Sequence, residues 1–274
     1  NDFEGSVSGW AGGYMATNKS YLYDGIGTSL SSFNPTRMTN LSASLSGPII
    51  KDKLTFFATA RRFENKGYLT GRNAYSPHGA YQDTLSLGSD LAAYRTIYNE
   101  QVDLNKPWYS IDTVVIAGNQ KLLIRDNGKR DSARVDMSAY ESQSFQGNLE
   151  FKLSKGFKLN AIGTVGNEEG GGYDHQNKFV PFGRSTSFRN NYSLNLKATI
   201  TPSNTTFITL NAANRYNEQK NYLYENPWDP RYFNSENISK YGLDIPGNGQ
   251  FSTYGNDTGR FERSTNTYII KGEI

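Results

Sequence analysis

The stretch SFQGNLEFKLSKGFKLNAIGTVG, residues 144–166, alternates apolar or small residues with polar ones over nearly its whole length. Successive side chains of a strand point to opposite faces, so a period of two places one class of residue on each face. Phe145 and Leu149 belong to the apolar class. The short interruption SKG fits a hairpin turn, in which Gly156 can adopt the left-handed conformation. The stretch therefore predicts two antiparallel strands with one apolar and one polar face.

The composition favours an all-β protein. The chain has 274 residues, of which 36% are hydrophobic and 20% charged, with 27 Gly, 19 Tyr and 15 Phe. Tyr and Phe are enriched in strands, and Gly is enriched in turns. The mean hydropathy of -0.67 is low for so aromatic a chain. Apolar and polar residues are therefore interleaved.

Several classes of function find no support in the sequence. The absence of Cys excludes disulfides, thiolate metal sites and cysteine nucleophiles. The net charge of +3 comes without a block of Lys or Arg, so we expect no nucleic-acid partner. No hydrolase, phosphate-binding or zinc-protease motif is present, so we expect no enzyme and no cofactor. No apolar run is long enough for a membrane helix, but a membrane strand needs only about 9–11 residues.

The connections between the predicted strands alternate between short and long. Period-two alternation predicts strands at 3–16, 36–49, 53–66, 140–154, 157–168, 190–201, 205–219 and 261–274. Tight turns follow the second, fourth and sixth strands, and long connections follow the first, third, fifth and seventh. Outer-membrane barrels have short periplasmic turns at one end and long extracellular loops at the other. The pattern predicts an antiparallel transmembrane β-barrel with long extracellular loops, embedded in the lipid bilayer.

The polar phase of the strands is predicted to face the lumen. A Lys on the lipid face near the bilayer midplane costs about 2–4 kcal/mol, whereas a lumen Lys costs little. The predicted lumen-facing residues are Gln146, Asn148, Glu150, Lys152, Lys158, Asn160, Asn195, Lys197, Lys271 and Glu273. Adjacent Arg61 and Arg62 cannot both point inward, so we expect them to reach the interface near the upper strand end.

Aromatic residues gather toward the strand ends, which predicts two interfacial belts. The lower set is Phe3, Phe56, Phe57, Phe151, Phe157 and Phe207, and the upper set is Tyr14, Phe63, Tyr140, Tyr192, Tyr216 and Phe261. The alternative is that aromatics are simply good strand formers.

Three stretches resemble the barrel of TonB-dependent outer-membrane receptors, in the branch that carries a carboxypeptidase-regulatory-like domain. They are LSGPIIKDKLTFF (45–57), NKFVPFGRSTSFRNNYSLNLKATITPSNTTF (177–207) and NYLYENPWDPRYF (221–233). The resemblance implies that residues 1–274 are the N-terminal part of a barrel of about 22 strands in the cell outer membrane. It also implies a plug domain and active uptake of a scarce nutrient with energy delivered by the TonB system.

The last of these stretches is the sharpest binding candidate. Prolines stiffen it, which lowers the cost of ordering an aromatic face for a ligand. The candidate ligand contacts are Tyr222, Tyr224, Trp228, Asp229, Arg231 and Tyr232. The alternative is that these aromatics pack loop against loop.

Two other segments carry weaker expectations. Residues 67–139 are too long for an unstructured connector, and their apolar patches at 91–98 and 111–118 predict a small helix and a hairpin folded over the barrel mouth. In the run 167–177, acidic residues and a histidine could converge on a metal ion. A solvated loop tip is the favoured interpretation of that run, and we expect no metal site.

Two alternative functions remain at this stage. One is a membrane barrel that acts as a structural or interaction subunit of a surface assembly, with a surface lipoprotein as its partner. The other is a soluble carbohydrate-binding β-sandwich whose aromatic loops bind sugar.

Overall fold

The computed structural model describes residues 2–15, 33–86, 106–203, 205–229, 231–232 and 251–274. In these residues the regular structure consists of strands and one 3₁₀ turn, η2 (Pro181–Gly183), so the predicted all-β class is confirmed. The strands form antiparallel sheets of eight, three and two strands. The same residues contain no helix long and apolar enough to cross a membrane.

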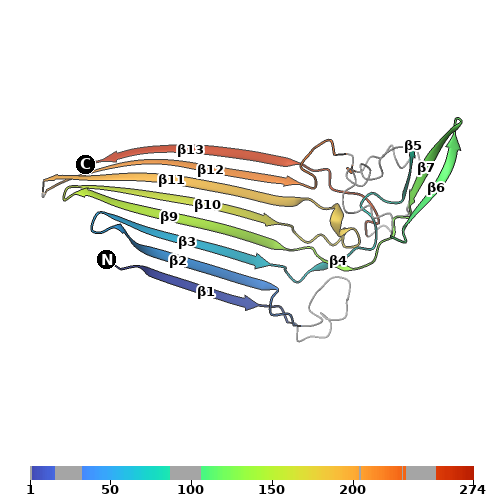
Figure 1. Ribbon diagram of the computed structural model, residues 1–274, viewed down its shortest axis with the longest axis horizontal. Helices are drawn as coiled ribbons and strands as arrows, with labels where there is room; N and C mark the ends of the chain where they lie inside the picture. Colours follow the sequence, from blue (N-terminus) through green and yellow to red (C-terminus); the bar gives the residue numbers. More distant parts are fainter. Residues whose placement is uncertain (1, 16–32, 87–105, 204, 230, 233–250) are drawn as a thin grey trace.

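The eight-stranded sheet holds all eight strands predicted from alternation, in the predicted order (Figure 1). In sheet order the strands are β1 (Glu4–Gly12), β2 (Met38–Ile50), β3 (Leu54–Asn65), β9 (Tyr140–Ser154), β10 (Phe157–Gly170), β11 (Thr186–Ser203), β12 (Thr206–Tyr222) and β13 (Phe261–Glu273). The edge strands β1 and β13 do not pair with each other in the described residues. The sheet is therefore open, and its closure as a barrel stays a prediction.

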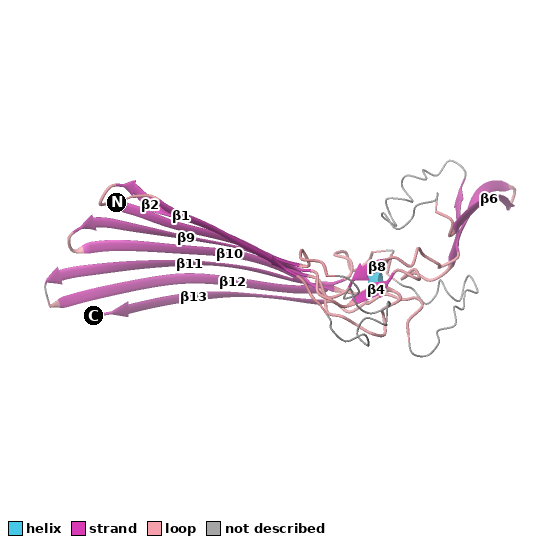
Figure 2. Cartoon of the chain, turned by 90° about the horizontal axis from the view of Figure 1, so that it is seen from below, coloured by secondary structure: helices cyan, strands magenta, loops and turns pink. Residues whose placement is uncertain are grey.

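The tight turns lie together at one end of the sheet and the long loops at the other (Figures 1 and 2). In the β2–β3 turn, Asp52 adopts a left-handed conformation with φ of 59°. Gly156, in the β9–β10 turn, has no positive φ, so the conformation predicted for it is wrong. Its lack of a side chain serves close packing, because a Cβ there would lie 2.8 Å from the carbonyl oxygen of Thr201.

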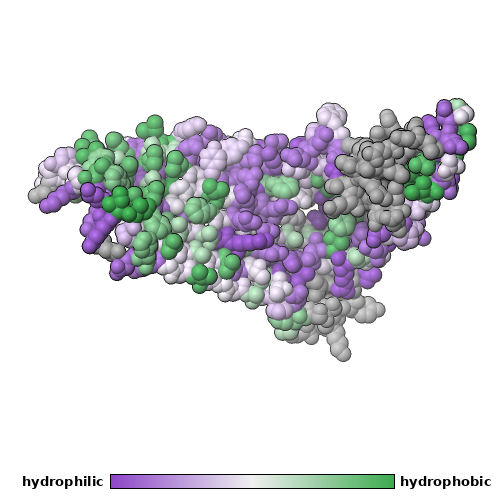
Figure 3. Space-filling view, in the orientation of Figure 1, coloured by the Kyte–Doolittle hydropathy of each residue, from purple (hydrophilic) through white to green (hydrophobic). Residues whose placement is uncertain are grey.

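Cross-strand pairing collects the apolar phases of the strands on one side of the sheet, which we call the apolar face. One row across it is Phe56, Leu149, Ala161, Leu196, Ala212 and Ile270, each paired with the next. These side chains are open to the surroundings: Leu149 is 46% exposed and Ile270 is 90% exposed. In Figure 3, hydrophobic residues gather over the half of the strands nearer the tight turns.

The opposite side, the polar face, holds all ten residues of the predicted polar phase. Register links them: Glu150 pairs with Asn160, and Asn160 pairs with Lys197. Lys158 bonds Glu150 at 2.6 Å, and Asn160 donates a hydrogen bond to Asn148 at 2.8 Å. The shared face agrees with the alternation in the sequence. That this face lines a lumen depends on closure and stays a prediction.

The hydrophobic core lies outside the large sheet. The buried hydrophobic residues of the described chain are Tyr109, Leu123, Ile124, Met137, Val180 and Tyr224, none of which belongs to the eight strands. The other two sheets lie at the loop end and do not cover a face of the large one (Figures 1 and 2). The described residues therefore lack the enclosed dry layer that a β-sandwich requires.

The described residues of the excursion, 67–86 and 106–139, contain five short strands. Its ends pair as β4 (Thr70–Arg72) and β8 (Arg134–Asp136), and beyond them β5 (Tyr81–Ser86), β7 (Asn119–Asp126) and β6 (Tyr109–Ile116) form the three-stranded sheet. The hairpin predicted around 111–118 is thus confirmed as β6–β7. The helix predicted at 91–98 lies outside the described residues. The three-stranded sheet extends past the other loops, away from the large sheet (Figure 2).

The adjacent arginines of β3 lie on opposite faces of the sheet, which agrees with the prediction that they cannot both point inward. Arg61 lies on the polar face and donates to Asn40 at 2.6 Å, whereas Arg62 lies on the apolar face and pairs with Glu141 at 3.0 Å. Arg62 therefore has an acidic partner, and its position at a membrane interface stays a prediction.

The upper aromatic set does not form a belt on one face. Tyr192 and Tyr216 stack on the apolar face with ring centres 5.0 Å apart. Phe63 and Tyr140 contact each other on the polar face at 6.1 Å. The prediction of a single upper belt is wrong, because these residues occupy strand positions that face opposite sides of the sheet.

Candidate binding surface at the loop end

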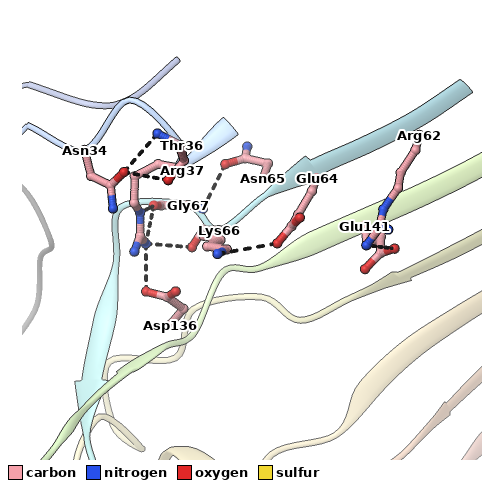
Figure 4. Close-up of polar contacts among 10 residues, drawn as sticks. All are labelled: Asn34, Thr36, Arg37, Arg62, Glu64, Asn65, Lys66, Gly67, Asp136 and Glu141. Carbon is pink, nitrogen blue, oxygen red and sulfur yellow. Dashed lines mark hydrogen bonds and ion pairs between the residues drawn. The ribbon is translucent and has the colours of Figure 1, made fainter. Parts of the chain in front are cut away.

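Arg37 ties the start of β2 to both ends of the excursion 67–139 (Figure 4). Its side chain, 11% exposed, donates to the carbonyl oxygens of Lys66 and Gly67 and pairs with Asp136 at 2.7 Å. Its own carbonyl accepts from the N–H of Lys66 at 2.8 Å. The chain leaves β3 at Gly67 and returns along β8 at Asp136. This one side chain therefore holds the root of the excursion.

The loops share a small core above the large sheet. Val180 is fully buried and Met137 is nearly so. The Lys178 side chain is buried as well, and its ammonium lies 4.1 Å from the ring centre of Phe251 and 5.3 Å from that of Phe179. A cation over an aromatic face gains about 2 kcal/mol when desolvated. The loops after β10 and before β13 are thereby packed together.

The aromatic loop, residues 222–229 and 231–232, is fixed by contacts within itself and with β11. Tyr222 stacks on Phe188 with ring centres 5.0 Å apart. The Tyr232 hydroxyl donates to the carbonyl of Tyr224 at 3.0 Å and accepts from its N–H at 3.1 Å. The loop is closed by this side-chain bridge across eight residues.

Charged groups fix the tip of the aromatic loop. Arg231 donates two hydrogen bonds to Asp229, at 2.9 and 2.7 Å, and its guanidinium lies 3.9 Å from the ring centre of Tyr224. These donors lower the pKa of the Asp229 carboxyl and the pairing raises the pKa of Arg231. Burial raises the pKa of Tyr224 to about 12. The Tyr224 hydroxyl is buried without a hydrogen-bond partner among the described residues.

The six predicted ligand contacts therefore fall into two groups. Tyr222, Tyr224, Asp229, Arg231 and Tyr232 all serve contacts inside the protein, which the loop-packing alternative predicts. Trp228 is different, because it is 88% exposed. Ligand contact stays a prediction for all six, and the indole of Trp228 is the group that its surroundings leave open.

Two polar hollows meet at Arg184. One, of about 290 Å³, is bordered by Glu64 and Thr186, and the other, of about 570 Å³, by Asn221 and Asp257. The guanidinium of Arg184 donates to a backbone carbonyl at 3.1 Å. Burial lowers its pKa, and nearby carboxylates oppose that effect. The larger volume is in the range of small-ligand sites, and its lining offers amides, hydroxyls and charged groups for hydrogen bonding.

The candidate metal ligands of the acidic run 167–177 do not converge in the described residues. Glu168 and Glu169 are neighbours in β10 and so lie on opposite faces. Asp174 accepts from the N–H of Gln176, and His175 bonds the hydroxyl of Tyr173 at 2.8 Å. The described residues contain no cluster of three or more metal-binding side chains.

Sequence reasoning missed the arginines that organise the loop end. Arg260 donates to the carbonyls of Tyr224 and Glu225 at 3.2 and 2.6 Å and so joins β13 to the aromatic loop. In the excursion, Arg130 forms a buried ion pair with Asp126 at 2.6 Å. The contacts of Arg260 have no local signal in the sequence, because they join residues about 35 positions apart.

Among the described residues, the loop end offers groups for hydrogen bonding and for aromatic contact. Comparison of the chain with known protein families, curated proteins and solved structures found no match.

Proposed function

We propose that this chain is part of an outer-membrane β-barrel receptor that takes up a scarce nutrient, with its polar face toward the lumen. The observation that carries the membrane location is the exposed apolar face of the large sheet. A single-layer sheet that exposes Leu149, Leu196 and Ile270 in one row needs an apolar partner on that side. The hydrocarbon interior of a bilayer would cover the apolar face of all eight strands at once.

The height of the apolar region supports this proposal. On β9 the apolar positions run from Phe145 to Leu153. At about 3.3 Å per residue they span about 26 Å along the strand. A tilt of about 40° reduces this to about 20 Å across the bilayer, close to the apolar band of about 25 Å in outer-membrane barrels.

The same face becomes charged beyond that region. Arg62 pairs with Glu141 at 3.0 Å (Figure 4), and Lys220 pairs with Glu218 at 3.0 Å. Ionic groups of this kind are too costly for a lipid-facing midplane but suit water or headgroups. The strands are therefore long enough to cross the bilayer and to extend beyond it at the loop end.

The receptor part of the proposal rests on the loop end and on the resemblance of the three stretches to TonB-dependent receptors. Such a receptor places its recognition loops outside the cell. The polar hollows at Arg184 and the exposed Trp228 lie at the end that would face outward. A plug domain and the TonB system are the partners that the resemblance implies.

Spin labelling tests the membrane location. Residues 1–274 contain no Cys, so Leu149→Cys and Asn148→Cys, made in a background where any Cys outside these residues is replaced by Ser, place single labels at adjacent positions on opposite faces of the sheet. In full-length protein in its native membrane, we expect the label at 149 to be relaxed by oxygen and protected from a water-soluble nickel complex. The label at 148 should show the reverse. Equal nickel access at both positions would refute a lipid-facing apolar side.

Uptake is tested separately. A strain carrying the full-length gene, a strain lacking that gene and a strain lacking TonB are grown in the same defined medium, and depletion of medium components is followed by mass spectrometry. We expect at least one component to be depleted only when both the receptor and TonB are present. Equal depletion in the strains with and without the gene would remove the transport function and leave the membrane location standing.

A second candidate function is that of an interaction subunit. The strand β6 is an edge of the three-stranded sheet and exposes Ile111, Val115 and Ile116, the second of them to 68%. An exposed apolar edge strand is suited to pairing with another chain, such as a surface lipoprotein. Val115→Arg should then abolish crosslinking to that partner without changing the uptake test.

A further inference from the structure

The excess positive charge of the chain is concentrated at two adjacent tight turns. We define the basic corner as residues 51–53 of the β2–β3 turn together with residues 150–158 around the β9–β10 turn. It contains five lysines and two carboxylates, an excess of three positive charges. The formal net charge of the whole chain is also +3, so the rest of the chain is balanced.

The two lysine-rich turns are also neighbours in space. The strand β3 pairs with β9, and the N–H of Lys152 donates to the carbonyl of Lys53 at 2.8 Å. Lys155 lies in the turn that follows β9 directly. The corner is therefore one surface at the turn end of the sheet.

Three of its lysines lack acidic partners among the described residues. Glu150 is shared by Lys152 at 3.6 Å and Lys158 at 2.6 Å on the polar face. The ammonium groups of Lys51, Lys53 and Lys155 have no carboxylate within 4 Å in the described part of the chain, and all three residues are exposed. Their charges are therefore open to an external anion.

Many cations at the loop end form ion pairs. Carboxylates within 4 Å accompany Arg37, Arg62, Lys66, Arg130, Arg189, Lys220, Arg231 and Arg260. Many cations near the loop end of the eight strands thus have an acidic partner in the described residues, whereas Lys51, Lys53 and Lys155 at the basic corner have none.

Exposed apolar side chains border the open lysines. Ile49, Ile50 and Leu153 are 56%, 50% and 56% exposed and directly precede the two turns. Lysine stems extend along apolar surface and place the ammonium several ångströms further on. An apolar edge with lysines just beyond it matches the boundary between acyl chains and phosphate groups.

We propose that the basic corner binds the phosphate groups of anionic phospholipids in the leaflet that faces the tight turns. The ammonium groups of Lys51, Lys53 and Lys155 supply the positive charge, and Ile50 and Leu153 contact the acyl chains close to the headgroups. The inference rests on the membrane location proposed above. It adds a lipid class and fixes which leaflet must contain it.

Native mass spectrometry of the full-length protein in neutral detergent tests this assignment. The probes are phosphatidylglycerol and phosphatidylethanolamine, added in equal amounts. We expect preferential retention of phosphatidylglycerol, and its loss in the triple variant Lys51→Gln, Lys53→Gln, Lys155→Gln, by roughly fivefold in affinity for each lysine at low salt. Binding should weaken as salt is raised, because exposed charges are screened.

The control variant Lys106→Gln, Lys121→Gln, Lys129→Gln removes the same charge at the loop end and should bind like the wild type. Equal phosphatidylglycerol retention by the wild type and the basic-corner variant would overturn the proposal. Displacement of the lipid by millimolar glycerol phosphate would also overturn it, because the acyl contacts would then contribute nothing.

Failure of the membrane location is a separate result. It would appear as nickel access to the label at position 149, whatever lipid the detergent-solubilised protein retains. Nickel protection at 149 combined with unselective lipid binding would reject the basic corner alone.

Discussion

Replacement of Arg37 by Met should open the root of the excursion 67–139 while leaving the large sheet paired. Met keeps much of the apolar stem but lacks the guanidinium. In the wild-type protein this group donates to the carbonyl oxygens of Lys66 and Gly67 and to the carboxylate of Asp136. These acceptors include two backbone groups that would lose their partner at a site where the side chain is 11% exposed.

The magnitude follows from the kind of hydrogen bond that is lost. Bonds to a charged donor contribute about 1.5–3 kcal/mol each, and removal of one partner of a buried pair costs about 3–5 kcal/mol. The Asp136 side chain is 31% exposed, so water replaces part of its loss. We therefore expect local opening to become easier by about 3 kcal/mol, which corresponds to faster amide exchange by about two orders of magnitude.

The assay is hydrogen exchange followed by mass spectrometry on the full-length protein in detergent micelles. Peptides that cover residues 66–72 and 134–139 should lose protection in Arg37→Met, whereas peptides from β10 and β11 should not. Arg37→Lys is the matched control, since it keeps the charge but can satisfy fewer acceptors, and should fall between the two. Unchanged protection at both roots in Arg37→Met would show that Arg37 does not hold the excursion.

Three further outcomes are expected. Leu149→Lys should destabilise the protein in a bilayer by about 2–4 kcal/mol, whereas Asn148→Lys should change its urea unfolding little. Equal effects would contradict the assignment of faces. Tyr232→Phe removes both hydrogen bonds of the hydroxyl that closes the aromatic loop, so it should lower the local stability of the loop by about 1–2 kcal/mol and make its proteolysis faster. Tyr224→Phe removes only a hydroxyl without a hydrogen-bond partner among the described residues, so its effect on loop stability should be neutral or stabilising. Because the pKa of Asp229 is lowered in the folded loop, its ion pair stabilises the loop above the unfolded pKa of about 3.9 and is lost as pH falls through the folded value; loop proteolysis should therefore be flat from pH 7 to 5 and rise only in stronger acid.

The large sheet could be predicted from the sequence because its information is local. A period of two assigns each residue of β9 to a face, and a two-residue turn after Ser154 fixes how β10 returns. The same rule, applied to Phe63 and Tyr140, would have placed them on the polar face. Tyr192 and Tyr216 occupy positions of the other phase, so the upper aromatic residues divide between the two faces.

The loop end could be predicted only in part, because its contacts join distant residues. The hairpin β6–β7 has a local signal in its alternating apolar residues. Arg37 and Asp136 are 99 residues apart, and no spacing rule connects them. Arg184 likewise gains its position from loops that follow different strands, so its place between two hollows becomes visible only in the folded chain.

The junction of β3 with β9 has a consequence for the order of folding. Asn65 pairs with Tyr140 across the whole excursion, whereas the pairs β2–β3 and β9–β10 are joined by tight turns. Closing a chain segment of that length costs about 2–3 kcal/mol more in entropy than closing a hairpin. The hairpins on either side should consequently form early, and their union along β3 and β9 should be a late and slow event that any factor assisting assembly would have to accelerate.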